Sequence, residues 1–256
     1  MKNQYYFISG LPRSGSTLLS AILQQNPRFH AGISDNLLAH VRSQVETANG
    51  VSYNEFDEEQ LKHIIKATFD SFYYNVPKPV IFNTNRLWTN LLPELRSLYP
   101  YTKVICCVRD ISRIMDSFER MHQQNPFKIS SVFPKEVDIN VYTRSSSLMS
   151  EGGIIKLPYD SLKSAITGPH LDMLMLVEYD LLTKNPEGTM KSIYNFIEQP
   201  YFEHDFNNVA SSYDEYDKTI KMNGLHSTRS IVEYKQRSYL IPPDVINKFS
   251  DLEVWR

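Results

Sequence analysis

The chain has few of the residues that mark disulfide-rich or metal-binding proteins. Among its 256 residues are two cysteines, Cys106 and Cys107, adjacent inside an apolar run. Because neighbouring residues of a strand point to opposite faces of a sheet, we expect two buried thiols and no disulfide. Neither cysteine has the spacing of a metal ligand, and the seven histidines form no His-x-x-x-His pair on a recognisable helix, so no metal site is expected.

Long apolar runs and an excess of charge of one sign are also missing. With 27 basic and 29 acidic side chains the net charge is −2, so any anion site has to be built locally. The residues before the apolar run Tyr5–Ile8 are too few for a signal peptide, and no apolar stretch reaches the roughly 20 residues that span a bilayer. We therefore expect a cytoplasmic protein without nucleic-acid or membrane partners.

Short apolar runs that are continuous rather than alternating predict strands buried on both faces of a parallel sheet. They are Tyr5–Ser9, Pro79–Phe82, Lys103–Val108 and Met173–Glu178. Residues with helical spacing separate the runs, so the predicted class is α/β: a three-layer parallel sheet with helices on both faces. Since the sequence has no repeat and no linker, residues 1–256 are predicted to form one domain.

The least periodic segment runs from residue 123 to residue 158. Three breakers interrupt it: Asn125-Pro126, Phe133-Pro134 and Gly152-Gly153. Because long irregular segments in compact domains often carry binding functions, we expect residues 123–158 to form a substrate loop or lid.

The first predicted strand ends in a glycine-bearing turn that leads directly into a helix. Such a turn aims backbone N–H groups and the helix N-terminus at one point, where phosphate or sulfate oxygens bind. Gly10 and Gly15 have the spacing of a Walker A loop, but Ser16 stands where that loop has its lysine, and the loop's cation is Arg13. The alternative is a Gly-Ser turn that only caps the helix.

A second candidate anion contact follows the third predicted strand. Arg109 ends that strand, and Ser117 lies eight residues further on, about two turns into the next helix. An arginine at the carboxyl end of a parallel strand points to the crevice where such sheets bind ligands, and with a serine it can hold a phosphate. The alternative is a surface arginine paired with Asp110, Asp116 or Glu119.

These motifs resemble those of sulfotransferases that use 3′-phosphoadenosine 5′-phosphosulfate (PAPS). Residues 11–18, Leu-Pro-Arg-Ser-Gly-Ser-Thr-Leu, are similar to the phosphosulfate loop of tyrosylprotein sulfotransferases and related bacterial enzymes, whereas the cytosolic enzymes usually carry lysine at the position of Arg13. The family uses an arginine and a serine at the separation of Arg109 and Ser117 for the 3′-phosphate. The resemblance implies a P-loop-like sulfotransferase fold, an enzyme of the PAPS-dependent class with PAP as product, and no metal.

Two later segments extend the resemblance. Val177–Leu182 is similar to a strand end whose tyrosine lies against the nucleotide, so Tyr179 is either a nucleotide contact or a core tyrosine. Gly224–Arg229 and the residues after it resemble a late loop that closes over the nucleotide, where Arg229 and Lys235 either add positive charge or are simply solvated. The cofactor-binding residues implied are Arg13, Ser14, Gly15, Ser16, Thr17, Leu18, Arg109, Ser117, Tyr179, Arg229 and Lys235.

Sulfuryl transfer depends on positioning and on electrostatic stabilisation. We expect the loop amides and the Ser16 and Thr17 hydroxyls to hold the 5′-phosphosulfate, and Arg13 to neutralise the charge on the bridging oxygen as it leaves. The general base must differ from that of the tyrosylprotein enzymes, because their glutamate corresponds to Ser34 in this chain. Asp35 is adjacent and His40 is a second choice. The alternative for Asp35 is an N-cap of the following helix.

The acceptor side is predicted from position alone. Residues after the second strand and within or beside the lid are expected to line it: Asn83, Asn85, Arg86, Trp88, Tyr142, Arg144 and Tyr159. We expect a small-molecule acceptor with a hydroxyl or nitrogen, from secondary metabolism. The chain resembles toxin-pathway bacterial sulfotransferases, including cyanobacterial ones, so a saxitoxin-like alkaloid is one candidate.

Two other functions stay open on this sequence. A P-loop small-molecule kinase would need the missing Walker lysine and a magnesium ligand, and a non-catalytic nucleotide-binding protein would bind without turnover. The oligomeric state is also open, because the short dimer motif of the cytosolic enzymes, Lys-x-x-x-Thr-Val-x-x-x-Glu, is absent.

Overall fold

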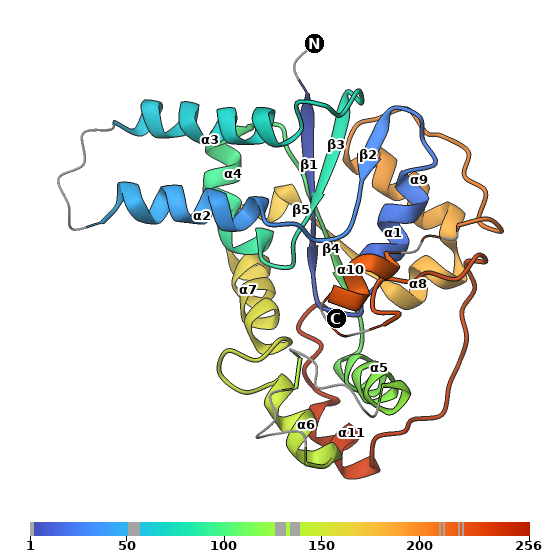
Figure 1. Ribbon diagram of the computed structural model, residues 1–256. Coiled ribbons are helices and arrows are strands. Elements are labelled where there is room, and N and C mark those ends of the chain that lie inside the picture. The colour runs from blue at the N-terminus through green and yellow to red at the C-terminus, as the bar shows by residue number, and fades with distance from the viewer. Residues whose placement is uncertain are drawn as a thin grey trace.

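The computed structural model describes residues 3–50, 57–125, 132–133, 139–209, 211, 213–219, 221 and 223–256. In these residues five strands form one sheet, in which every neighbouring pair is parallel and the order is β2-β3-β1-β4-β5 (Figure 1). The strands are β1 Gln4–Gly10, β2 Phe29–Ala31, β3 Val80–Thr84, β4 Val104–Val108 and β5 Leu174–Glu178. Within the described residues no helix is long and apolar enough to cross a membrane.

Both faces of the sheet are buried. In β1, Tyr5 and Phe7 belong to one apolar cluster, and Tyr6 and Ile8 belong to a second cluster on the opposite face. The two cysteines of β4 divide in the same way and are free thiols. The alternation explains why these strands appear in the sequence as continuous apolar runs, and it confirms the predicted three-layer α/β class.

Helices cover each face (Figure 1). One face is packed by α2, α3, α4, α5, α7 and α11, and the other by α1, α8 and α9. Their bounds are α1 Ser16–Leu23, α2 Leu37–Ala48, α3 Glu58–Phe72, α4 Leu92–Leu98, α5 Ile111–Gln124, α6 Val141–Leu148, α7 Lys156–Thr167, α8 Tyr179–Lys184, α9 Pro186–Phe196, α10 Asp214–Thr219 and α11 Pro243–Phe249, with short 3₁₀ turns at Trp88–Leu91 and Leu171–Met173.

The segment expected to be irregular contains more helix than its composition suggests. The Asn140 side chain accepts hydrogen bonds from the N–H groups of Tyr142 and Thr143, and the Thr143 hydroxyl receives one from the N–H of Asn140. This reciprocal cap starts α6 inside residues 123–158. Residues 126–131 and 134–138 lie outside the described residues, and the role of the segment as a lid stays a prediction.

The sheet has its topological switch point at β1, which lies between β3 and β4. Ligands of open parallel sheets bind at the carboxyl ends of the strands beside such a point. Gly10 ends β1 with a φ of 116°, and a Cβ there would lie 2.0 Å from the carbonyl oxygen of Cys107. Glycine is therefore required where the chain leaves β1, and the loop that follows opens at the switch point.

Candidate functional site

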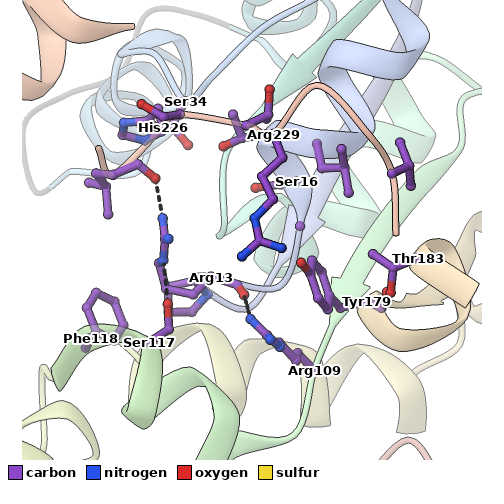
Figure 2. A pocket seen from close by; sticks show the side chains of 18 of the residues that line it. Arg13, Ser16, Ser34, Arg109, Ser117, Phe118, Tyr179, Thr183, His226 and Arg229 are labelled. Atoms are coloured by element: carbon purple, nitrogen blue, oxygen red, sulfur yellow. Dashed lines mark hydrogen bonds between the residues drawn. The ribbon is translucent and has the colours of Figure 1, made fainter. Parts of the chain in front are cut away.

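A pocket of about 400 Å³ lies at this end of the sheet. The loop after β1, the start of α1, α5, α8 and a late segment between residues 216 and 237 contribute to its walls (Figure 2). Among the described residues that line it, one side chain is a carboxylate, Glu233, and six are cations: Arg13, Arg86, Arg109, Arg229, Lys235 and Arg237. A chain with a net charge of −2 thus gathers local positive charge where an anion can enter.

The loop after β1 presents its backbone to the pocket. Gly15 has a φ of 97° and precedes α1, which has no side-chain cap, so the first N–H groups of α1 are not held by a capping side chain. A Cβ on Gly15 would lie 2.8 Å from the Tyr179 ring. Ser16 and Thr17 line the pocket, whereas the hydroxyl of the buried Ser14 donates to the Leu11 and Cys107 carbonyls. The Ser14 side chain therefore holds the loop against β4.

Arg13 connects three parts of the pocket (Figure 2). Its Nε donates to the Ser117 hydroxyl at 3.1 Å, a terminal nitrogen donates to the Leu225 carbonyl, and its own carbonyl accepts from Arg109 at 3.2 Å. Its φ of 58° is left-handed, which costs a non-glycine residue about 1 kcal/mol. Burial, and secondarily Arg109, lowers the pKa of Arg13 to about 10, so the guanidinium stays charged at neutral pH.

Arg109 lines the pocket, and no carboxylate of the described residues forms an ion pair with it. Its guanidinium stacks on the Tyr179 ring at 4.0 Å, and its Nε is buried without a hydrogen-bond partner. The three carboxylates considered as surface partners are engaged elsewhere in the described structure: Asp110 with the N–H of Arg113 at 2.8 Å, Asp116 with Arg120 at 2.7 Å, and Glu119 with Arg144 at 2.7 Å. Burial lowers the pKa of Arg109, because removal from water disfavours the charged guanidinium.

The structure brings together most of the predicted nucleotide contacts. Those that line the pocket are Arg13, Gly15, Ser16, Thr17, Leu18, Arg109, Ser117, Tyr179, Arg229 and Lys235. Figure 2 shows Arg229 extending into the pocket beside Tyr179. Residues separated by more than 200 positions in the sequence therefore share one cavity.

Of the predicted acceptor residues that the structure describes, most do not line this pocket. Arg86 lines the pocket, and burial lowers its pKa. Asn83 and Trp88 face the core, where the indole N–H donates to the Asn83 side chain at 2.8 Å. Asn85 shapes the turn after β3 by accepting from the N–H of Leu87. The other three do not line the pocket either: Tyr142 is half-exposed on α6, Tyr159 is buried on α7, and Arg144 is paired with Glu119.

The two candidate bases also lie outside the pocket lining. Asp35 Oδ1 accepts from the N–H of Leu37 at 2.9 Å, and Oδ2 accepts from the Asn83 amide at 2.7 Å. Both oxygens are thus used to start α2 and to hold β3 beside it. His40 is exposed on α2.

Several pocket residues were not predicted. Ser34, Phe118, Tyr216 and His226 line the cavity. The sequence did mark the loop that carries His226, but not the histidine itself, and Phe118 lies one position from the predicted Ser117. Tyr216 gave no local signal, because its helix α10 reaches the pocket only through the tertiary fold.

The family model and the curated relatives that match this chain are all described as sulfotransferases. The model of the sulfotransferase family matches residues 6–203. The chain is 24% identical over 206 residues to a Caenorhabditis briggsae protein named as a protein-tyrosine sulfotransferase, covering 77% of this chain and 66% of the relative. It is 22% identical to protein-tyrosine sulfotransferase 1 of Danio rerio, covering 76% of this chain and 53% of that one. The chain thus spans less than two thirds of either relative.

Solved structures share the fold at low sequence identity. The sulfotransferase domain from the curacin biosynthetic pathway matches with a TM-score of 0.52 and 14% identity, over 99% of this chain and 92% of that one. Retinol dehydratase, in a complex with androsterone and the inactive cofactor PAP, matches with a TM-score of 0.52 and 14% identity, over 98% and 80% of the two chains.

Proposed function

We propose, from the premise that this chain belongs to the sulfotransferase family, that it transfers the sulfuryl group of PAPS to a small-molecule acceptor. The observation that carries the proposal is the unpaired cation cluster at the switch point. Among the described residues Arg13 and Arg109 have no carboxylate partner, and the buried Nε of Arg109 has no hydrogen-bond partner. A buried cation in this state is costly unless an anion completes it.

The donor set fits a nucleotide with two separate anionic groups. The loop amides, Arg13 and the hydroxyls of Ser16 and Thr17 would hold the 5′-phosphosulfate. Arg109 and Ser117 would hold the 3′-phosphate, with the Arg109 guanidinium already oriented by its stacking on Tyr179. Arg229 and Lys235 would add positive charge from the late segment. Ser14, which is committed to the loop, would contribute its backbone only.

Arg13 would stabilise the transition state. Negative charge develops on the bridging oxygen as the sulfuryl group leaves, and a charged guanidinium held in a partly water-excluded pocket stabilises it without reorganising. The contacts of Arg13 with Ser117 and Leu225 fix the guanidinium from two sides. Its lowered pKa of about 10 leaves it protonated across the physiological range.

The acceptor is proposed to enter beside the apolar part of the pocket lining. Phe118, Val132 and Ile154 are side chains of this part, and the last two belong to the predicted lid segment. An apolar wall beside the nucleotide contacts suits an acceptor with an apolar body, such as a phenol, alcohol or amine of secondary metabolism. A saxitoxin-like alkaloid is one such candidate. A tyrosine side chain is the second candidate, because the relatives are named for protein-tyrosine sulfation.

The first test is calorimetric titration with PAP, beside ATP with magnesium. PAP is expected to bind tightly without metal, and ATP weakly, because the loop lacks the Walker lysine. Transfer from PAPS to a panel of phenols, alcohols, amines and a tyrosine peptide would then identify the acceptor. Preference for magnesium-ATP would favour the kinase alternative, and binding of PAP with no turnover on any acceptor would favour a non-catalytic nucleotide-binding protein.

Asp35→Asn separates the two roles considered for this residue. Asparagine keeps an oxygen for the Leu37 N–H but places an N–H₂ group against the Asn83 amide, so we expect a loss of about 1–2 kcal/mol of unfolding free energy. PAP affinity and the pH–rate profile should stay as in the wild type. Thermal unfolding and the rate of PAPS turnover against pH measure both effects. Loss of the rising acid limb of that profile would instead identify Asp35 as the general base.

A further inference from the structure

A carboxylate and an imidazole form a close pair beside the pocket. Asp217 of α10 is fully buried, and its Oδ1 lies 2.6 Å from Nδ1 of His226. Its second oxygen, Oδ2, accepts from the backbone N–H of His226 at 2.9 Å. These two contacts from the Asp217 carboxylate fix both the backbone position of His226 and the orientation of its ring. Burying a carboxylate completely is unfavourable unless it is paired, so the burial of Asp217 depends on its contacts with His226.

The pairing decides which ring nitrogen is free. A carboxylate accepts hydrogen bonds, so Nδ1 of neutral His226 carries the proton and donates it to Asp217. Nε2 is then left with a lone pair. The side chain of His226 is 18% exposed and lines the pocket. An imidazole oriented by a buried carboxylate, on a side chain that lines a cavity and with its other nitrogen outside that pairing, has the arrangement of a general base.

The pair lies close to the group assigned to the leaving oxygen. Arg13 donates to the carbonyl of Leu225, the residue next to His226. In Figure 2, His226 and Phe118 lie at one end of the pocket, while Tyr179 and Arg109 lie at the other. Ser34, where the tyrosylprotein enzymes carry their glutamate, is drawn at the same end as His226. The base that the primary sequence lacks at Ser34 can thus come from the late segment.

We propose that His226 is the general base of the transfer and that Asp217 is its positioning residue. The inference rests on the proposed function. Nε2 takes the proton from the acceptor hydroxyl or amine as the acceptor atom forms its bond to sulfur. The bond between sulfur and the bridging oxygen breaks, and its electron pair leaves with the 5′-phosphate of PAP. The imidazolium, held by Asp217, then returns its proton to solvent.

The charged groups around the imidazole determine where it titrates. Asp217 faces it from α10, Arg13 from the loop after β1, and Arg86 from the turn after β3, and the rings of Tyr213 and Tyr216 pack edge-on. Burial lowers the pKa of His226, Asp217 opposes that shift, and the two arginines add to it. A base works when unprotonated, so kcat/KM for PAPS should rise with pH through a value below the ordinary imidazole range and level off by neutral pH.

His226→Gln tests the base, because glutamine fills similar space but takes up no proton at these pH values. PAPS turnover, measured as sulfate release with water as acceptor and as transfer to the acceptor panel, should fall on the order of 10²-fold. The rising acid limb of the pH profile should disappear, while calorimetric PAP affinity stays within about twofold. Asp217→Asn should also lower turnover, since an amide N–H₂ facing Nδ1 favours the wrong tautomer. His63→Gln, on the exposed part of α3 outside the pocket, is the matched control.

A measurement on the unsubstituted protein completes the test, in case the buried Asp217 does not tolerate change. Nitrogen-15 NMR of the histidine side chains should find neutral His226 protonated at Nδ1. Protonation at Nε2, or unchanged turnover and an unchanged acid limb in His226→Gln, would overturn the inference with the donor site intact. Wild-type protein that fails to bind PAP, or that binds it but transfers to neither water nor any acceptor, would refute the proposed function and, with it, this inference.

Discussion

Arg13→Ala is expected to lower PAPS turnover on the order of 10³-fold, the largest effect of any single change in the pocket. The guanidinium is the cation of the phosphosulfate loop, and its two side-chain contacts hold it in one orientation before any ligand arrives. A preorganised charge aimed at a leaving oxygen acts mainly in the transition state, so kcat should fall more than PAP affinity. Single-turnover kinetics with PAPS, beside calorimetric PAP binding, measure the two effects separately.

Two companion variants define what the side chain of Arg13 does. Arg13→Lys keeps the charge but loses the planar fork, and should recover part of the lost rate. Arg28→Ala, an exposed arginine after α1, is the matched control and should behave as the wild type. Near-normal turnover in Arg13→Ala would show that the leaving oxygen is stabilised by other groups and would remove Arg13 from the mechanism.

Arg109→Ala is expected to weaken PAP binding on the order of 10²-fold, which corresponds to about 2.7 kcal/mol. The guanidinium is oriented by Tyr179 and by the carbonyl of Arg13, and one of its buried nitrogens has no partner. A 3′-phosphate bound to this guanidinium is held by charge-assisted bonds that alanine cannot replace. Adenosine 5′-phosphosulfate, which has no 3′-phosphate, should lose much less affinity than PAP in the same variant.

The ligand-free protein should respond to Arg109→Ala in the opposite direction. Arg13 and Arg109 repel each other, and this repulsion contributes to the lowered pKa of Arg13. Removing one charge relieves it, so the melting temperature without ligand should stay level or rise, while the stabilisation by a fixed PAP concentration shrinks. Thermal unfolding with and without PAP measures both, with Arg96→Ala on α4 as the control. Equal stabilisation by PAP in the variant and the wild type would place the 3′-phosphate elsewhere.

The sequence predicted those parts of the molecule that depend on local pattern. The four continuous apolar runs became β1, β3, β4 and β5, because burial on both faces removes alternation. Strand β2 was missed, since three residues that include His30 carry too little pattern. Helix α6 was missed because its serine-rich sequence lacks an apolar helical pattern, and the reciprocal cap at Asn140 was not recognised.

The residues of the site likewise differ in whether local sequence pattern or tertiary packing places them. Arg13, Arg109 and Ser117 could be predicted because each follows a strand or helix start at a fixed offset. Asn83 and Trp88 follow a strand too, but their mutual hydrogen bond and the surrounding core direct them away from the pocket. The pair of Asp217 and His226 had no signature at all, because nothing in its nine-residue separation implies that both contacts come from one carboxylate.

The contact between Arg13 and Leu225 joins residues 212 positions apart. During synthesis, therefore, the phosphate loop leaves the ribosome long before the residues that close the pocket over it. The turn between β1 and α1 is synthesised early, whereas the Leu225 carbonyl that accepts from Arg13 is synthesised much later. The cation cluster of Arg13 and Arg109 is thus synthesised before the segment that covers it, and the donor site is complete only when translation has passed Lys235.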